Sequence, residues 1–183
     1  MTCHHGLVQR AVPSLTLSCA GPEHAAQVVE LVNEGLEGYR AWAPAGWRLA
    51  VPGKDEVLRI AERLKLPEVW CQLGHIKGQL VGIVSLAPRT RADPDPPAPG
   101  TLKLWQLFVR PAWQGRGVAA ALLDSAVAEA KRRGVHRLSL FTPRDHARAC
   151  AFYEREGWAP TGRESDGGDL GLPAVEYARS IGV

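Results

Sequence analysis

The sequence predicts an α/β fold built on a mixed, mostly antiparallel central sheet that is flanked by helices. Short apolar segments alternate along the chain with segments whose apolar residues recur at helical spacing, which is typical of this class. Residues 69–86 show two apolar runs around a Lys77–Gly78 turn, which predicts an antiparallel hairpin. The apolar run at 101–109 leads instead through a loop into a helical pattern. The sheet is therefore expected to contain both a hairpin and a connection that passes through a helix.

Length and composition indicate one globular domain. The chain has 183 residues, of which 45% are hydrophobic and 22% charged, enough for a single core. The formal net charge of +3 is mild and argues against a dedicated nucleic-acid-binding protein. We expect residues 1–12 to form a flexible tail and residues 13–183 to form the domain.

Cysteine spacing and the lack of long apolar runs indicate the cellular compartment in which the chain is expected. The four cysteines, Cys3, Cys19, Cys71 and Cys150, form no Cys-x-x-Cys pair and have no spaced histidine partner. A zinc site is therefore not expected, and the chain is expected to be reduced and cytoplasmic. No run of 18 apolar residues occurs, and the chain start has no signal-peptide core, so a membrane partner is not expected.

The first half of the chain is expected to contain three strands and two helices. Pro22 suits the first position of a helix, because the N–H group that proline lacks would be unsatisfied there. In the second helix we expect Val57, Leu58, Ala61 and Leu64 to face the core. In chain order the expected elements are a strand at 15–19, a helix at 22–36, a loop with two tryptophans at 39–51, a helix at 54–65, the hairpin at 69–86 and a proline-rich surface loop at 93–100.

The second half is marked most clearly by a helix that begins near Val118, whose apolar residues form one wide stripe. Its last turn carries Lys131, Arg132 and Arg133, where cations are favoured, and Gly134 suits the position after a helix. A nucleic-acid surface is another use of this basic triplet, but the helix end explains it fully. The other expected elements are strands at 101–109 and 135–141, a helix at 145–156, and strands at 159–162 and 174–179.

The stretch from Leu104 to Ala119 is the most informative part of the chain. An apolar strand enters a Gln-Gly-Arg-Gly loop at 114–117, which opens directly into the helix. The unsatisfied N–H groups at a helix N-terminus, together with its dipole, favour an anion there. The two glycines lack a Cβ atom, so an anion can approach the backbone closely. The sequence therefore predicts a phosphate-binding loop.

Three phosphate-binding patterns compete for this loop. A P-loop is absent, because the sequence has no Gly-x-x-x-x-Gly-Lys-Ser/Thr run. A dinucleotide fingerprint is formally present, since Gly115-x-Gly117-x-x-Ala120 fits Gly-x-Gly-x-x-Ala. That fingerprint also needs an acidic residue at the end of the next strand, about 20 residues on, to hold a ribose, and no acid closes the strand expected at 135–141. The third pattern, Gln/Arg-x-x-Gly-x-Gly/Ala, matches residues 114–119 at every fixed position.

A second segment strengthens the third pattern. The helix expected to end near residue 156 carries Phe-Tyr-Glu at 152–154 and is followed by Gly-Trp at 157–158. With these motifs and the hairpin that precedes the loop, the chain resembles the GCN5-related N-acetyltransferase (GNAT) family over residues 15–180. The resemblance implies a GNAT-like acyl-CoA N-acyltransferase fold, with acetyl-CoA as the cosubstrate.

The resemblance also implies where acetyl-CoA binds. The pyrophosphate lies on the glycine loop, and the pantetheine arm lies in the wedge between the strands that end near Val109 and Phe141. The arm pairs there with strand backbone as a short extra strand. His146 stands where the family often has asparagine, and its ring either donates a hydrogen bond to the arm or fills the helix start. The implied contact residues are Leu107, Phe108, Val109, Gln114, Gly115, Arg116, Gly117, Val118 and Ala119, together with His146.

The chemistry follows from the same resemblance. An amine attacks the thioester carbonyl, and a backbone N–H near Val109 can stabilise the oxyanion. Tyr153 matches the family's tyrosine that acts as an acid toward the leaving thiolate, although packing on an amphipathic helix is another use of its ring. Many members carry a glutamate base on the central strand, but this chain has Gln106, which cannot accept a proton at neutral pH. Glu68 and His75 are further candidate bases that no motif places.

The chain is therefore expected to be an N-acetyltransferase that transfers an acetyl group to a primary amine by direct attack in a ternary complex. The acceptor can be a small molecule, an antibiotic, or a protein lysine or N-terminus, bound near the loop at 39–47 and the last strands. Gln106 keeps an alternative open, a non-catalytic acyl-CoA-binding or sensor domain. A metal ion and nucleic acid are not expected, and a homodimer is compatible with the family.

Overall fold

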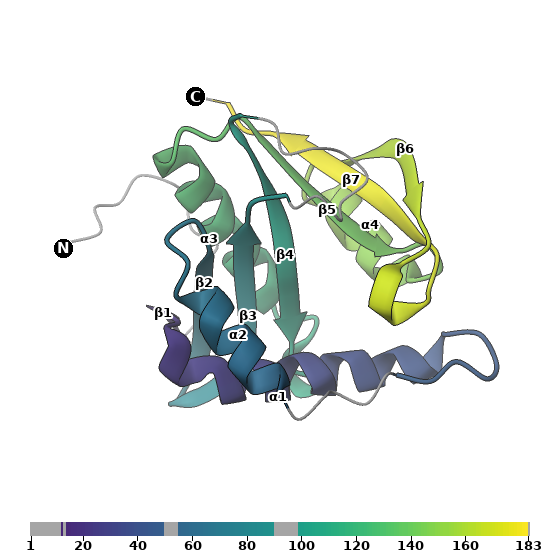
Figure 1. Cartoon of the computed structure of the whole chain (residues 1–183), viewed down its shortest axis with the longest axis horizontal. Helices are drawn as coiled ribbons and strands as arrows, with labels where there is room; N and C mark the ends of the chain where they lie inside the picture. The colour runs from purple at the N-terminus through teal and green to yellow at the C-terminus, as the bar shows by residue number, and fades with distance from the viewer. Residues whose placement is uncertain (1–11, 13, 50–54, 90–98, 183) are drawn as a thin grey trace.

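The computed structural model describes residue 12 and residues 14–49, 55–89 and 99–182. Within these ranges seven strands form one sheet in the order β1-β2-β3-β4-β5-β7-β6 (Figure 1). Neighbouring strands are antiparallel except β4 and β5, which run parallel, so the predicted mixed, mostly antiparallel sheet is confirmed. The strands are β1 (Leu15–Cys19), β2 (Trp70–Ile76), β3 (Gln79–Ala87), β4 (Thr101–Val109), β5 (Arg137–Pro143), β6 (Ala159–Ser165) and β7 (Ala174–Ser180).

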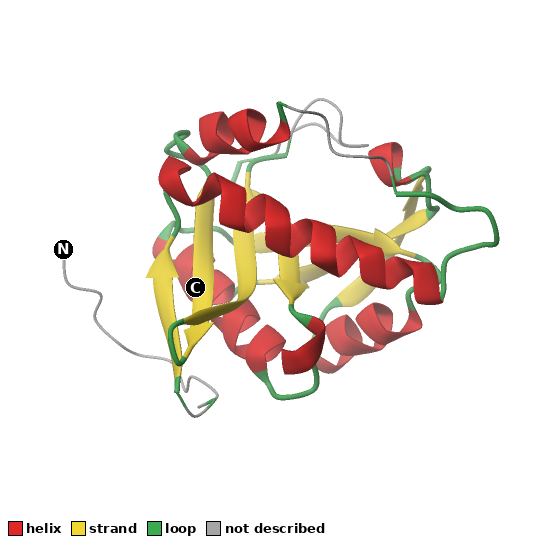
Figure 2. Cartoon of the chain, turned by 90° about the horizontal axis from the view of Figure 1, so that it is seen from below, coloured by secondary structure: helices red, strands yellow, loops and turns green. Residues whose placement is uncertain are grey.

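Helices cover both faces of this sheet (Figure 2). The α-helices are α1 (Ala25–Glu37), α2 (Glu56–Leu64), α3 (Val118–Arg132) and α4 (Ala147–Arg155). Short 3-10 turns are η1 (Pro22–His24), η2 (Gly38–Ala41), η3 (Pro111–Trp113) and η4 (Gly168–Leu170). α1 and α2 pack on one face through a core that includes Val28, Leu31 and Ile60. α3 and α4 pack on the other face through a larger core that includes Leu122 and Tyr153.

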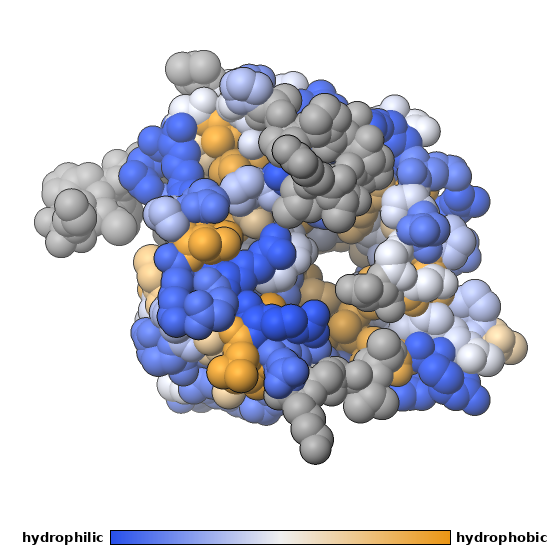
Figure 3. All heavy atoms as spheres, in the orientation of Figure 1, coloured by the Kyte–Doolittle hydropathy of each residue, from blue (hydrophilic) through white to orange (hydrophobic). Residues whose placement is uncertain are grey.

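The strands β4 and β5 stay together only at their first residues. Their parallel pairing joins residues 101–103 to residues 137–139. Beyond Lys103 the two strands separate, and Figure 1 shows them diverging toward their carboxyl ends. We call the space between residues 104–109 and residues 140–143 the wedge. Figure 3 shows the surface hollowed in this region, with apolar residues in its depth.

The end of α3 moves the start of β5 two residues beyond its predicted position. Gly134 has a left-handed φ of 69°, which glycine adopts at low cost. Its N–H donates to Lys131 O at 2.9 Å, and the Val135 N–H donates to Ala130 O at 2.9 Å. Together these bonds form the Schellman motif that commonly ends a helix. Because the Val135 N–H is used there, β5 begins only at Arg137.

The predicted inward face of α2 is partly wrong. Ala61 and Leu64 are half-buried against the smaller core as expected. The buried residue of α2 is Ile60, which was not predicted to face the core. Val57 and Leu58 are 39% and 64% exposed. Leu58 lies about 200° around the helix from Ile60, and Val57 lies in the first turn at the margin of the contact. A helix of 9 residues buries a narrower stripe than the sequence analysis assumed.

Parts of the predicted tail and of the proline-rich loop lie outside the described residues. Val12 is described, and its carbonyl oxygen accepts a hydrogen bond from the Leu15 N–H at 3.1 Å. Its side chain packs against the larger core, so the folded part of the chain includes residue 12. Within the described ranges, no helix is both long enough and apolar enough to cross a membrane.

Candidate active site

The pairing of β3 with β4 determines which backbone groups of β4 face the wedge. The Arg110 N–H donates to Val81 O at 2.9 Å. Residues in antiparallel strands alternate between positions that bond to the partner strand and positions that point away from it. Phe108 therefore directs its backbone groups toward β3, whereas Leu107 and Val109 direct theirs toward the wedge. Two of the three predicted strand contacts thus direct backbone groups toward the wedge.

Side chains complete this edge of β4. The Gln114 side-chain Nε2 donates to the Val109 carbonyl oxygen at 3.0 Å, which agrees with the direction assigned to Val109. Phe108 packs into the smaller core on the α1 side of the sheet. A Cβ atom added to Gly35 of α1 would collide with the Phe108 ring, so the ring fills the space above that glycine. Phe108 is therefore placed by packing rather than by its backbone.

A β-bulge lies where β4 leaves β5. Ser85 of β3 is opposite Gln106, but the next residue, Leu86, is opposite Leu104, so Trp105 is an extra residue on β4. Such bulges bend a strand and re-aim its side chains, and they are frequent beside active sites. The Ser85 hydroxyl donates to Gln106 Oε1 at 3.4 Å. The bulge therefore sets a neutral amide, oriented by Ser85, beside the wedge.

The glycine loop has the geometry that the sequence predicts. Gly115 and Gly117 have left-handed φ values of 77° and 84°. The first intrahelical bond of α3 is donated by the Ala121 N–H to Gly117 O at 3.0 Å. The N–H groups of Val118 and Ala119 precede that bond and have no partner within the helix. They point, with the positive end of the helix dipole, at one place beside the carboxyl end of β4.

Two arginines stand beside this amide cluster. The Arg116 guanidinium lies 5.2 Å from the centroid of the Trp113 ring, which holds the cation next to the loop. Arg148 Nη1 donates to Gln114 Oε1 at 2.6 Å. Arg148 Nη2 also lies 4.0 Å from the place that a Cβ atom on Gly115 would occupy. Sequence analysis missed Arg148, and the available signal was its place in the first turn of a helix that follows a strand bordering the wedge.

Tyr153 is fixed by the way α4 ends. Gly157 has a left-handed φ of 79°, its N–H donates to Glu154 O at 3.0 Å, and the Trp158 N–H donates to Tyr153 O at 3.0 Å. This second Schellman motif brings the Trp158 ring to 5.9 Å from the Tyr153 ring, edge to face. Tyr153 is only 9% exposed, and this burial raises the pKa of its hydroxyl. The phenol therefore keeps its proton at neutral pH.

His146 occupies the start of α4. Its Nδ1 accepts a hydrogen bond from the Ala149 N–H at 3.3 Å, which makes it the N-cap of the helix. Its ring lies 4.6 Å from the Trp42 ring and 5.2 Å from the Tyr39 ring. Burial lowers the pKa of His146, so the ring is neutral at neutral pH and Nδ1 can accept. His146 thus caps the start of α4, and its contact with a pantetheine arm stays a prediction.

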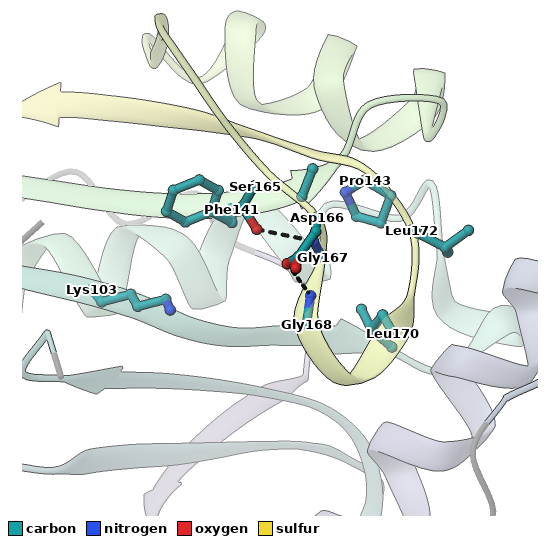
Figure 4. A pocket seen from close by; sticks show the side chains of 10 residues that line it. Lys103, Phe141, Pro143, Ser165, Asp166, Gly167, Gly168, Leu170 and Leu172 are labelled. Atoms are coloured by element: carbon teal, nitrogen blue, oxygen red, sulfur yellow. Dashed lines mark hydrogen bonds between the residues drawn. The ribbon is translucent and has the colours of Figure 1, made fainter. Parts of the chain in front are cut away.

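A pocket of about 400 Å³ lies along β5, from Lys103 near the junction of β4 and β5 to Pro143 at the carboxyl end of β5 (Figure 4). It lies between β4, β5 and the connection from β6 to β7. The loop after α1 adjoins it, because Trp47 Nε1 donates to the Leu170 carbonyl oxygen at 2.8 Å. The glycine loop does not line this pocket. Its lining residues are Lys103, Phe141, Pro143, Ser165, Asp166, Gly167, Gly168, Leu170, Leu172 and Ala174.

Residues 37–158 match the acetyltransferase (GNAT) family. This chain belongs to that family. The matched residues run from the end of α1 to Trp158 and contain the wedge, the glycine loop and Tyr153. The resemblance that the two sequence motifs indicated is therefore confirmed, and the fold agrees with it.

Known proteins resemble this GNAT chain to different extents. The uncharacterized N-acetyltransferase YjgM of Escherichia coli K12 is 27% identical over 137 residues, which cover 72% of this chain and 74% of YjgM. The mycothiol acetyltransferase of Beutenbergia cavernae is 41% identical over 64 residues, which cover 35% of this chain and only 22% of that protein. The structure of yncA from Salmonella typhimurium, solved with its cofactor acetyl-CoA, has a TM-score of 0.72 at 20% identity and covers 93% of this chain and 95% of that chain.

The bases that the sequence left open lie away from the wedge of this GNAT domain. His75 lies on β2, opposite Thr16 of β1, and β2 is separated from β4 by β3. The Glu68 carbonyl oxygen accepts from Arg133 Nη1 at 2.9 Å, which places Glu68 at the end of α3 remote from the glycine loop. The length of α3 separates the two ends by about 22 Å. Gln106 therefore remains the polar side chain of β4 at the bulge.

Glu176 is a buried carboxylate on the strand next to β5, opposite Phe141. It forms an ion pair with Arg89, and the Thr161 hydroxyl donates to its Oε2 at 2.8 Å. Arg89 Nη2 also donates to the Ser139 hydroxyl at 2.6 Å. The ion pair and the hydrogen bond tie neighbouring strands together. Sequence analysis did not foresee this network, which supports the sheet beside the pocket.

Proposed function

We propose that this GNAT protein is an N-acetyltransferase that transfers an acetyl group from acetyl-CoA to a primary amine by direct attack in a ternary complex. One observation carries the proposal: an amide cluster suited to phosphate lies at the open end of a wedge whose β4 edge offers backbone to an extended ligand. A pyrophosphate followed by an extended pantetheine arm fits that order. The similarity in fold to yncA, which was solved with acetyl-CoA, supports the same assignment.

On this proposal the glycine loop holds the pyrophosphate. The amides of Val118 and Ala119 donate to phosphate oxygens at the helix N-terminus. Arg116 and Arg148 neutralise phosphate charge, and Arg148 is aimed by its 2.6 Å bond to Gln114. Both loop glycines leave room for phosphate oxygens next to the backbone. Arg116 is exposed, and its guanidinium lies beside the Trp113 ring next to the amide cluster.

Leu107 binds the pantetheine arm through its backbone. Its N–H and C=O groups face the wedge, so an extended amide-bearing arm pairs with them as an added strand. The Val109 carbonyl oxygen is held by Gln114, and the Val109 N–H is left for the thioester carbonyl. His146 lies at the start of the helix across the wedge, where its ring contacts the arm. Phe108 supports this edge from the opposite face of the sheet, by packing against Gly35.

The transfer step needs a donor at the carbonyl oxygen and a donor at the leaving sulfur. The amine nitrogen bonds to the carbonyl carbon, the carbon–sulfur bond breaks, and its electron pair leaves on sulfur. The Val109 N–H faces the wedge and donates to the developing oxyanion. The Tyr153 hydroxyl, which burial keeps protonated, donates to the leaving sulfur.

The amine also has to lose a proton, and Gln106 cannot take it. Its amide, oriented by Ser85, holds a water molecule through which the proton leaves. This arrangement favours an amine that reaches the wedge already neutral. The free thiol of coenzyme A and the acetylated amine are the products.

A thiol-release assay with acetyl-CoA and a panel of amines tests the proposal. Release of free thiol together with an equal amount of acetylated amine supports it. A second candidate, an acyl-CoA sensor domain, is favoured by the glutamine where many relatives carry a base. The sensor predicts that acetyl-CoA binds but that no amine in the panel releases thiol.

A further inference from the structure

We infer that Arg110 is a positioning residue for acetyl transfer, because it fixes the end of β4, and with it the Val109 N–H, against α1. This inference rests on the proposed acetyltransferase function, in which that N–H donates to the developing oxyanion. Arg110 directly follows Val109 in the chain. Its backbone and its side chain make separate sets of bonds, and both sets hold the same end of the strand.

The backbone of Arg110 joins the end of β4 to its neighbours. Its N–H donates to Val81 O of β3 at 2.9 Å, and its carbonyl oxygen accepts from the Trp113 N–H of η3 at 2.9 Å. The Val109 carbonyl oxygen accepts from Gln114 Nε2 at 3.0 Å. The peptide unit between Val109 and Arg110 is therefore held at both of its polar ends. The Val109 N–H belongs to the preceding peptide unit and lies next to this fixed point.

The side chain of Arg110 adds bonds that cross from the sheet to a helix. Its Nε donates to the Leu80 carbonyl oxygen of β3 at 3.0 Å. Its Nη1 donates to the Glu34 carboxylate, and its Nη2 donates to Glu30 Oε1 at 3.2 Å. Both glutamates belong to α1. One planar guanidinium, whose donors point in fixed directions, thus links β3, the end of β4 and α1.

The bond to Glu34 is the better protected part of this link. The side chains of Arg110 and Glu34 are 22% and 36% exposed, whereas that of Glu30 is 70% exposed. An exposed ion pair contributes little, and a pair shielded from water depends more strongly on both partners. Two carboxylates compensate this cation, which distinguishes it from Arg116 and Arg148 beside the glycine loop.

The helix α1 extends the link toward the side of the wedge where the acceptor is expected. Figure 1 shows α1 running past the carboxyl end of β4, and Gly35 of this helix packs under the Phe108 ring. In η2, directly after α1, the Tyr39 ring lies 4.7 Å from the Trp42 ring and 5.2 Å from the His146 ring. A shift of α1 relative to β4 would therefore move this aromatic segment relative to the oxyanion donor.

The expected consequence of losing the link is kinetic. The bond from the Val109 N–H to the carbonyl oxygen strengthens as negative charge develops in the transition state. Pyrophosphate contacts on the glycine loop do not change during the reaction. A misplacement of about 1 Å at a catalytic group can cost about a hundredfold in rate. Loss of the link should therefore lower kcat and leave binding of acetyl-CoA almost unchanged.

A pair of arginine variants tests this expectation in the thiol-release assay. Arg110→Met keeps an apolar stem and removes the guanidinium, and it should lower kcat about tenfold or more. Arg133→Met is the matched control, because Arg133 is also 22% exposed, pairs with Glu129 at 2.6 Å and donates to the Glu68 carbonyl oxygen at 2.9 Å. It lies at the end of α3 remote from the glycine loop.

The two arginine variants separate a positioning role from a general effect on the fold. Both should lower the melting temperature by similar amounts, since each removes one half-buried cation with an ion pair and a bond to a backbone carbonyl. Arg133→Met should keep kcat within about twofold of the wild type. A normal kcat in Arg110→Met, or an equal loss of kcat in both variants, would overturn the inference.

A variant on α1 tests the same link without a change in β4. Glu34→Gln keeps the shape of the side chain and removes its charge, so kcat should fall about threefold or more. Glu56→Gln of α2, which loses an ion pair with Arg59, is its control and should keep kcat. Combining Arg110→Met with Glu34→Gln should lower kcat no further than Arg110→Met alone, because the two residues act as one unit. Losses that multiply would contradict the link.

Calorimetric titration with acetyl-CoA separates this inference from the proposed function. Arg110→Met should bind acetyl-CoA with a Kd within about threefold of the wild-type value. Weaker binding with a normal kcat at saturating acetyl-CoA would reject the positioning role and leave the acetyltransferase proposal standing. No binding of acetyl-CoA to the wild type, or binding without turnover of any amine, would reject the acetyltransferase proposal, and this inference with it.

Discussion

The two sides of the candidate active site are built from different materials. The cofactor side is made mostly of backbone: two left-handed glycines, the start of α3 and the edge of β4 that faces the wedge at Leu107 and Val109. The acceptor side is made of side chains that come from β4, β5 and the connection between β6 and β7. Backbone geometry belongs to the fold, whereas a pocket of side chains can change through a few substitutions. We therefore expect the shared cosubstrate to be recognised by the first side and the particular acceptor by side chains of the second.

The largest effect is expected when a bulky side chain replaces a glycine of the loop. Gly117→Trp should weaken binding of acetyl-CoA about a hundredfold, because Gly117 has a φ of 84° beside the amide cluster and a Cβ atom there would lie 3.3 Å from Val12. Calorimetric titration measures the loss. Gly134→Trp is the matched control, since its φ is 69° and a Cβ atom there meets open space. It should cost about 1 kcal/mol of unfolding free energy and bind normally. An equal loss of binding in both variants would remove the special role of the loop.

A similar loss is expected in turnover when the proposed acid is removed. Tyr153→Phe should lower kcat about a hundredfold and leave KM for acetyl-CoA unchanged, because the ring still packs on Trp158 while the hydroxyl is lost. Tyr177→Phe is the control, since its hydroxyl belongs to the same cluster but donates to Glu154 at 2.9 Å. That variant should keep kcat. Normal turnover by Tyr153→Phe would leave Tyr153 with a packing role alone.

The pH dependence of turnover tests the missing base. With Gln106 at the bulge, kcat/KM should rise about tenfold per pH unit from pH 6 to 9 for an amine with an ordinary pKa, because only the neutral amine reacts. Gln106→Glu adds a carboxylate at the same place and should raise the rate at pH 7 and flatten the profile. Steady-state rates in overlapping buffers give both curves. A plateau above pH 7 in the wild-type profile would reveal a protein base that Gln106 does not provide.

A smaller effect is expected at the arginine that the sequence analysis missed. Arg148→Met should weaken acetyl-CoA binding about tenfold, since a cation aimed at the loop by Gln114 is lost. Binding of S-acetyl-pantetheine, which has no pyrophosphate, should not change. Arg144→Met removes an exposed arginine that pairs with Glu164 and serves as the control. Equal weakening for both ligands would show that Arg148 acts on the fold and not on phosphate.

The smallest effect is expected in how the stability of the fold changes with pH. Burial holds the pKa of His146 below its ordinary value of 6.5. As the pH falls, the unfolded chain therefore takes up a proton at this residue at a higher pH than the folded chain does. Its contribution to stability is therefore complete above about pH 6.5 and is lost as the pH falls below that value. His146→Asn keeps an N-cap acceptor and should make thermal unfolding less sensitive to pH between 7.5 and 5. The same pH sensitivity in wild type and variant would contradict this account.

Much of the cofactor side could be predicted because its signals are local. Gly115, Gly117 and Gly134 adopt the left-handed backbone that their places between or after elements require. The Gly157–Trp158 pair ends α4 and holds Tyr153, so a motif taken from the family has a physical basis in helix capping. These features depend on neighbours within a few residues of each other. The strands and helices that they separate were accordingly placed to within a few residues.

The rest depends on contacts between distant segments. Gln114 and Arg148 meet although they are 34 residues apart, and the bulge at Trp105 exists only in the pairing of β3 with β4. The exposed side of α2 was misjudged at Leu58, because the packing partner and not the periodicity decides which stripe of a short helix is buried. The pocket could not be predicted for the same reason, because its lining residues come from β4, β5, the connection between β6 and β7, and β7.

The most direct test of the central claim is calorimetric titration of the wild-type protein with acetyl-CoA and, in parallel, with NADH. The account predicts that acetyl-CoA binds and that NADH does not, because the glycine loop lies beside the wedge in which an extended pantetheine arm fits. Binding of NADH in place of acetyl-CoA, or of neither ligand, would contradict the assignment of the loop and the wedge to acetyl-CoA.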